Sequence, residues 1–190
     1  MFNTLSQKAL AGAVSMFALV AVCGGANYWS TTTLTASLAD SAVDGDMLRS
    51  HLTADMMHDA LRADVLAALV AASPDSGVSI ADVKTSLKEH ADEFHAAIAH
   101  EGSLEVAPEV KAALAGVEAP LNEYVAAAER LVLLAETHPA GALAGLPAFM
   151  KQFEVLEGAM EDVTNVMSAD ATASVATANA NADIAEIMIA

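Results

Sequence analysis

Hydrophobic residues recur every three to four positions along most of the chain, which is the spacing that gathers them on one face of an α-helix. The first such segment covers residues 34 to 72 and ends in a cluster of turn formers at residues 73 to 77. A second begins after Ser79, a favourable N-cap residue, and stops near Gly102. These boundaries predict a first helix of about 40 residues and a shorter second one, joined by a tight turn.

Proline positions mark the starts of two further helices. Pro108 fits the first turn of a third helix that runs to about Thr137, with Pro120 inside it. Pro147 fits the first turn of a fourth helix that continues towards the end of the chain. Short connections make consecutive helices antiparallel neighbours, and no segment alternates with the period of a strand. We therefore expect an all-α, up-down-up-down four-helix bundle.

An apolar run precedes the bundle. Residues 9 to 26 contain no charged side chain, and this length approaches the roughly 20 residues that a helix needs to cross a bilayer. Lys8 precedes the run, while Tyr28 and Trp29 follow it, where aromatic rings favour the membrane interface. Basic residues favour the cytoplasmic side, so the pattern predicts a membrane anchor with the rest of the chain outside.

The predicted organisation is a cytoplasmic N-terminus over 1–8, a transmembrane helix over 9–27, and a periplasmic domain over 28–190. The expected location is the inner membrane, with most of the chain in the periplasm. A cleaved signal peptide is the alternative, although its apolar core is usually only about 7 to 15 residues long. Lipid attachment at Cys23 is disfavoured by the bulky Val22 before it.

Composition narrows the function. The chain has 25 acidic and 8 basic side chains, a net charge of -17, which opposes binding to nucleic acid phosphates. All of the acidic side chains follow the apolar run. A single cysteine excludes an intramolecular disulfide, and the sequence has no nucleophile elbow, phosphate-binding loop or zinc-protease motif. We expect no enzymatic activity.

Polar residues interrupt the expected inward stripe of the first helix. That stripe takes in Leu48, Leu52, Leu66 and Leu69, and between them Asp55, His58 or Asp59, and Arg62. His90 in the second helix and Tyr124 in the third also occupy inward positions. Counting about 1.5 Å per residue from the turns puts these residues and Phe153 at one level, with Glu157 one turn lower. The count predicts one polar layer to which all four helices contribute.

This layer has several candidate uses. His58, Arg62, His90 and Tyr124 form a candidate ligand site, in which the planar fork of Arg62 suits a carboxylate. Alternatively, His58, His90 and Glu157 supply two imidazoles and a carboxylate, a set that suits zinc or another divalent metal, while haem is the weaker option. A third possibility is a hydrogen-bonded core whose polar groups only fix the helix register.

The chain resembles the periplasmic sensor domain of a group of bacterial methyl-accepting chemotaxis receptors. The residues that carry the resemblance are Met56-Met57-His58-Asp59-Ala60-Leu61-Arg62-Ala63-Asp64-Val65-Leu66, Glu89-His90-Ala91 with Phe94, Pro120 with Tyr124, and Phe149, Phe153, Leu156-Glu157 and Met160. The resemblance implies a homodimeric four-helix bundle that binds a ligand outside the cell and signals by helix displacement. The family's second transmembrane helix, HAMP relay and cytoplasmic region do not follow here, so we expect a fragment or a truncated relative.

A structural role is the alternative function. In that case the bundle dimerises or docks a periplasmic binding protein without binding a small ligand itself. The two functions differ in one testable respect, because only the sensor requires the polar layer for a response. The acidic field favours a cation over an anion at long range, so a carboxylate ligand would depend on Arg62 locally.

Overall fold

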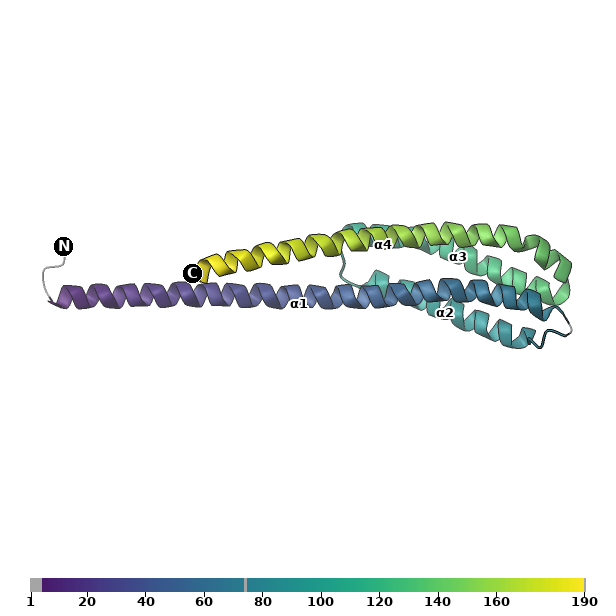
Figure 1. Ribbon diagram of the computed structural model, residues 1–190, viewed down its shortest axis with the longest axis horizontal. Helices are drawn as coiled ribbons and strands as arrows, with labels where there is room; N and C mark the ends of the chain where they lie inside the picture. Colours follow the sequence, from purple (N-terminus) through teal and green to yellow (C-terminus); the bar gives the residue numbers. More distant parts are fainter. Residues whose placement is uncertain (1–4, 74, 190) are drawn as a thin grey trace. The chain divides into compact units, whose positions relative to one another are not determined.

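A computed structural model describes residues 5–73 and 75–189, and within these ranges all regular structure is α-helical. The four helices are α1 (Leu5–Ala71), α2 (Ile80–Ser103), α3 (Pro108–Thr137) and α4 (Pro139–Ile189) (Figure 1). This arrangement confirms the all-α prediction. The third helix has the limits predicted from Pro108 and Thr137.

The chain divides into two compact units. The core unit comprises Val43–Asp170, and the terminal unit comprises Met1–Ala42 together with Ala171–Ala190. The core unit therefore contains the C-terminal part of α1, all of α2 and α3, and the N-terminal part of α4.

One hydrophobic core fills the core unit, and all four helices contribute to it. The largest side chains with almost no exposure are Tyr124, Phe94, Phe149, Met47, Leu61, Leu121 and Leu156. Burying a residue of this size contributes about 1.5 to 3 kcal/mol relative to leaving it exposed. The aromatic members come from α2, α3 and α4.

Local signals explain where α2 and α3 begin. The Ser79 hydroxyl accepts a hydrogen bond from the Asp82 backbone N–H at 3.3 Å, and the Asp82 carboxylate lies in the first turn of α2. Both features stabilise a helix N-terminus. Pro108 opens α3, where its missing N–H costs nothing because that group has no partner within the helix.

The predicted start of α4 at Pro147 is wrong. The helix begins at Pro139, and Pro147 lies inside it. The sequence offers two possible helix starts, Pro139 and Pro147, since either proline fits a first helical turn. The His138 carbonyl accepts hydrogen bonds from the N–H groups of Gly141 and Ala142, which starts the helix eight residues earlier than predicted.

The inward stripe predicted for α1 is also wrong in part. Leu48, Leu52 and Leu66 are 43 to 55% exposed, and Asp55 is exposed as well. The buried face instead carries Met47, Ser50, His51, Ala54, His58, Leu61, Val65 and Ala68. Neighbouring helical positions differ by about 100° around the axis, so a one-residue error in register exchanges the faces. The prediction assigned the wrong face because it took the leucines of α1 as buried, although Leu48, Leu52 and Leu66 are exposed.

The terminal unit is made of the first part of α1 and the last part of α4. Its apolar side chains are exposed, including Leu10, Val14, Phe17 and Val20. Among the residues that the structure describes, one helix, α1 near the N-terminus, is long and apolar enough to cross a membrane, with a window of mean hydropathy 2.0 that is not buried at all. Length and composition therefore agree with the anchor expected from the sequence.

Candidate functional site

His58 lies in an aromatic cluster to which all four helices contribute, with two rings, Phe149 and Phe153, from α4. The His58 ring stacks on Phe153 of α4, with centroids 4.0 Å apart and planes at 7°. Tyr124 of α3 meets it edge-on at 5.1 Å, and Phe94 of α2 lies at 6.3 Å. The structure thus brings together three residues that were predicted to share one level: His58, Tyr124 and Phe153.

The polar atoms of this cluster bond to protein groups. His58 Nε2–H donates to the Phe153 carbonyl at 3.2 Å, and the Tyr124 hydroxyl donates to the His58 carbonyl at 2.9 Å. Burial lowers the pKa of His58 below its usual value of 6.5, because a charged imidazole is poorly solvated here. Burial likewise raises the pKa of Tyr124. Both side chains are therefore neutral hydrogen-bonded members of the core at pH 7.

Arg62 lies at the edge of the cluster and reaches solvent. Its guanidinium carbon is 4.2 Å from the centroid of the Phe153 ring, a cation–π contact. Its Nη2 donates to Asp59 Oδ1 at 2.7 Å, and the two side chains are 36% and 61% exposed. An exposed ion pair of this kind is worth about 0 to 1 kcal/mol, so a competing carboxylate can displace Asp59 at little cost. Arg62 is the predicted site residue whose charged group an external anion can reach.

His90 forms a separate contact between α1 and α2. Its Nδ1 lies 2.7 Å from Asp64 Oδ2, and the imidazole is half-buried. Burial raises the pKa of Asp64, while the hydrogen bond from His90 opposes that shift. Asp64 is six residues beyond His58, about 9 Å along the axis. Counting from the turn placed His90 level with His58. The α2 residue that lies opposite His58 is instead Phe94, about one turn farther along the helix.

The three predicted metal ligands face different partners. His58 is committed to the Phe153 carbonyl, His90 contacts Asp64, and Glu157 is exposed on α4. Among residues 5–73 and 75–189, no group of three or more His, Cys, Asp or Glu side chains is arranged to hold a metal ion. Metal binding by this set stays a prediction.

A second polar cluster, formed by His51, Glu101 and Thr164, was missed by the sequence analysis. His51 Nδ1 lies 3.4 Å from Glu101 Oε2, and His51 Nε2 lies 3.0 Å from Thr164 Oγ1. Glu101 is fully buried. The pattern contained a signal, because His51 precedes His58 by seven residues and Glu101 follows Phe94 by seven. Two helical turns of spacing place each pair on one face.

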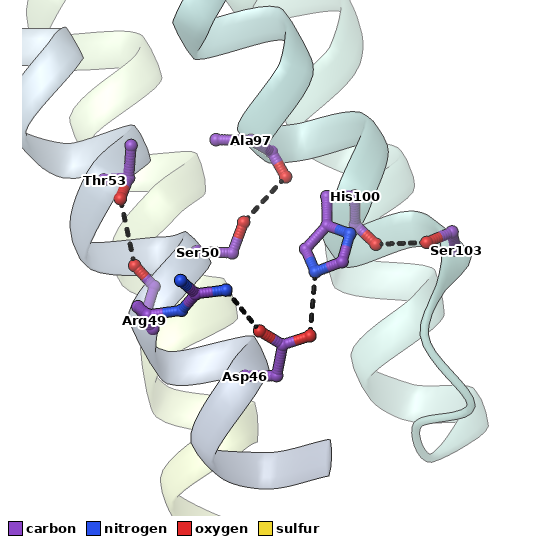
Figure 2. Close-up of polar contacts among 7 residues, drawn as sticks. All are labelled: Asp46, Arg49, Ser50, Thr53, Ala97, His100 and Ser103. Atoms are coloured by element: carbon purple, nitrogen blue, oxygen red, sulfur yellow. Dashed lines mark hydrogen bonds and ion pairs between the residues drawn. The ribbon is translucent and has the colours of Figure 1, made fainter. Parts of the chain in front are cut away.

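Polar contacts of Asp46 and Ser50 join α1 and α2, as Figure 2 shows. Asp46 accepts hydrogen bonds from Arg49 Nη2 at 2.8 Å and from His100 Nε2 at 2.9 Å. These two bonds lower the pKa of Asp46. The Ser50 hydroxyl donates to the Ala97 carbonyl at 3.1 Å. The end of α2 is therefore tied to α1 by both exposed and buried hydrogen bonds.

Comparisons with known proteins leave the family open. No protein-family model matches the chain, and neither a curated protein nor a solved structure matches it.

Proposed function

We propose that this chain is the membrane-anchored sensor module of a receptor of the chemotaxis type. A transmembrane helix over 9–27 leads into a periplasmic four-helix bundle, which pairs with a second copy and responds to a small ligand by helix displacement. The observation that carries the proposal is the continuity of α1. One helix, Leu5–Ala71, includes both the uncharged run and His58 of the aromatic cluster. A displacement of α1 at the cluster thus acts on the same element that forms the anchor.

The outer face of α1 supports pairing with a second copy. Leu48, Leu52 and Met56 follow one another at helical spacing, as do Leu66 and Val70, and each is 43 to 59% exposed, with exposed Asp59 between the two groups. The outer face of α2, by contrast, carries Lys84, Lys88, Asp92 and Glu93. An apolar stripe of this kind is costly in water and is typical of an interface. We propose a second copy of the chain as the partner that covers this stripe. The anchor of each copy would hold both chains in the same membrane and bring identical stripes together.

Substitution in the stripe tests this dimer. We expect Leu52→Arg to convert the dimer to a monomer, because the guanidinium would be desolvated at the centre of the interface. Leu133→Arg is the matched control, since Leu133 on α3 is 57% exposed against 55% for Leu52. Chemical crosslinking of the full chain in nanodiscs distinguishes the two. Equal crosslinking of both variants and the unmodified chain would exclude the stripe as the interface.

Arg62 supports the choice of a carboxylate as ligand. The Phe153 ring fixes one face of the guanidinium, and exposed Asp59 already occupies part of its edge in the way a ligand carboxylate would. Asp59 uses one guanidinium nitrogen, Nη2, whereas a ligand carboxylate can pair with two nitrogens of the planar fork and gain specificity as well as energy. A ligand that replaces Asp59 would pull on α1 and on Phe153 of α4 together, which couples binding to a displacement between these helices.

Calorimetry on the full chain in nanodiscs tests ligand binding with acetate, succinate, malate and zinc chloride as probes. We expect a carboxylate to bind and Arg62→Ala to abolish the binding. Arg49→Ala is the matched control, because Arg49 forms the same type of ion pair with Asp46 three residues away. If no carboxylate binds, or if both variants lose binding equally, Arg62 is not the recognition residue.

One observation favours the structural alternative. The ring nitrogen of His58 and the hydroxyl of Tyr124 both bond to backbone carbonyls, as expected of a network that only sets helix register. This alternative predicts that His58→Phe, Arg62→Leu and His90→Leu together preserve folding and dimerisation. A triple variant that folds and pairs normally but loses a carboxylate response would decide for the sensor.

A further inference from the structure

The Arg62 guanidinium is held against a ring that the core fixes from behind. The His58 ring stacks on Phe153 with 4.0 Å between the centroids, and the guanidinium carbon of Arg62 lies 4.2 Å from the same Phe153 centroid. One face of a phenyl ring has room for only one of these groups at such a distance. Phe153 therefore lies between His58 and Arg62, and the guanidinium has a defined position at the surface of the cluster.

The polar groups behind Arg62 have no hydrogen to offer a ligand. His58 Nε2–H donates to the Phe153 carbonyl, and the Tyr124 hydroxyl donates to the His58 carbonyl. A neutral imidazole and a phenol each carry a single polar hydrogen, so both are committed to the protein. Within this cluster, as far as the structure describes it, Arg62 alone supplies the donors for an external anion.

Carboxylates accompany Arg62 on the same side of α1. Asp59 Oδ1 accepts from Arg62 Nη2 at 2.7 Å, and Asp55 is an exposed residue about two turns before Arg62. The charges that act on the His58 ring are those of Asp59, Asp55 and Arg62, which are two carboxylates and one guanidinium. The surroundings of the guanidinium are thus negative even before a ligand arrives.

The other basic side chains of the core unit lie away from Arg62. Four of them pair with carboxylates elsewhere, namely Arg49, Lys84, Lys88 and Lys111. Arg130 is exposed on α3, about 120° around the helix from buried Tyr124, and Lys151 is exposed on α4, about 160° around the helix from Phe153. Among the described residues of the core unit, Arg62 is therefore the cation that serves this site.

This balance of charges distinguishes between ligands. One carboxylate can replace Asp59 at the guanidinium, whereas a second carboxylate on the same short ligand meets carboxylates and finds no cation. We propose that the Arg62 site selects monocarboxylates over dicarboxylates. The inference rests on the carboxylate recognition at Arg62 proposed above, and it names the class of ligand. An unpaired charge on the wrong ligand is a general means of specificity.

The expected selectivity is modest because the second carboxylate stays in contact with water. One repulsion between unit charges 4 Å apart in water corresponds to about a fivefold change in affinity. Asp59 and Asp55 act in the same direction, and the net charge of -17 adds to them at longer range. We therefore expect a monocarboxylate to bind about three- to tenfold more tightly than a dicarboxylate of the same length.

Calorimetry of the full chain in nanodiscs at pH 7.5 tests the selectivity with butyrate, succinate and monomethyl succinate. All three contain a four-carbon acid, and only succinate has a second charge. We expect butyrate and monomethyl succinate each to bind at least about threefold more tightly than succinate. If succinate binds as tightly as butyrate and Arg62→Ala abolishes both, the selectivity is wrong and the carboxylate site stands. If none of the three binds, the carboxylate site fails and the selectivity fails with it.

Replacement of Asp55 tests the physical cause. Asp55→Asn removes an exposed charge near Arg62 and keeps the ion pair between Arg62 and Asp59. We expect this variant to raise the affinity for succinate about twofold more than the affinity for butyrate. Glu93→Gln is the matched control, because it removes the same charge from an exposed position of α2 and should leave the ratio of the two affinities unchanged. An equal ratio in both variants would overturn the proposal that carboxylates beside Arg62 exclude dicarboxylates.

Discussion

At the scale of single residues, hydrogen bonding decides what the polar members of the core do. Sequence reasoning identified His58 and Tyr124 as inward, because each interrupts an apolar stripe at helical spacing, and both are buried. It did not foresee that each would bond to a backbone carbonyl of another helix, because such partners depend on the rotation of two helices about their axes. His51 and Glu101 were missed although they repeat His58 and Phe94 at a spacing of seven.

Replacement of Tyr124 by Phe measures the buried hydroxyl. We expect Tyr124→Phe to lower the free energy of unfolding by about 1 to 2 kcal/mol, since it removes one buried hydrogen bond and little volume. Tyr28→Phe is the control, because Tyr28 is 75% exposed and should change stability negligibly. Denaturant titration of both variants checks this, and equal effects would contradict a special role for the buried hydroxyl.

Tyrosine ionisation offers an independent measurement. The chain has two tyrosines, and burial raises the pKa of Tyr124. We expect an alkaline absorbance titration of the folded chain to show one tyrosine ionising while the other stays protonated. A raised pKa also means that stability contributed by the neutral phenol persists up to about pH 10 and is lost at higher pH. Tyr124→Phe should remove the delayed component of the titration.

His58 controls the acidic side of the stability profile. Burial lowers the pKa of His58, so its contribution is present above the ordinary value near 6.5 and is lost as the pH falls towards the folded-state value. Between pH 7.5 and 5, denaturant titration should show the unmodified chain losing more stability than His58→Phe. His95→Phe, at an exposed position of α2, should retain the acid loss.

At the scale of elements, helix starts were predictable where one signal stood alone and were missed where two competed. Ser79 and Pro108 each marked a single start, and the structure agrees. Pro139 and Pro147 are both suitable for a first helical turn. The helix starts at Pro139, where the N–H groups of Gly141 and Ala142 donate to the His138 carbonyl. The rotation of α1 escaped prediction for a different reason, since leucines on an outward face imitate a buried stripe.

The N-cap of α2 is worth testing because its side chain satisfies a backbone N–H in the first turn of the helix. We expect Ser79→Ala to reduce the free energy of unfolding by about 1 kcal/mol, since Asp82 N–H then loses its acceptor. Ser103→Ala removes a hydroxyl from the other end of the same helix, where it donates to the His100 carbonyl. The effect of Ser103→Ala should be smaller, because Ser103 does not cap a helix N-terminus. Thermal unfolding by circular dichroism compares the two.

At the scale of the whole molecule, net charge sets the background against which each site acts. The chain carries a net charge of -17, and the side chains of Glu118, Glu123 and Glu129 on α3 are all exposed. Self-repulsion of this size destabilises a compact state and is screened by salt. Loss of the His58 contribution as the pH falls below neutrality adds to this background.

Salt should therefore stabilise the protein. Raising sodium chloride from about 0.01 M to about 0.15 M shortens the screening length from about 30 Å to about 8 Å, and we expect the unfolding temperature to rise. A variant with Glu118, Glu123 and Glu129 replaced by Gln should begin at a higher temperature and gain less from salt. An equal gain in both proteins would show that repulsion among these carboxylates is unimportant.

The aromatic residues are divided between the two units in a way that labels them separately. Trp29, the only tryptophan, lies beside Tyr28 in the terminal unit, while Tyr124 is the only tyrosine of the core unit. Excitation of tryptophan alone would follow the terminal unit through the wavelength of its emission. Tyrosine emission in a Tyr28→Phe background would follow the core unit. Melting of the two units can thus be recorded in one cuvette, without attaching a dye.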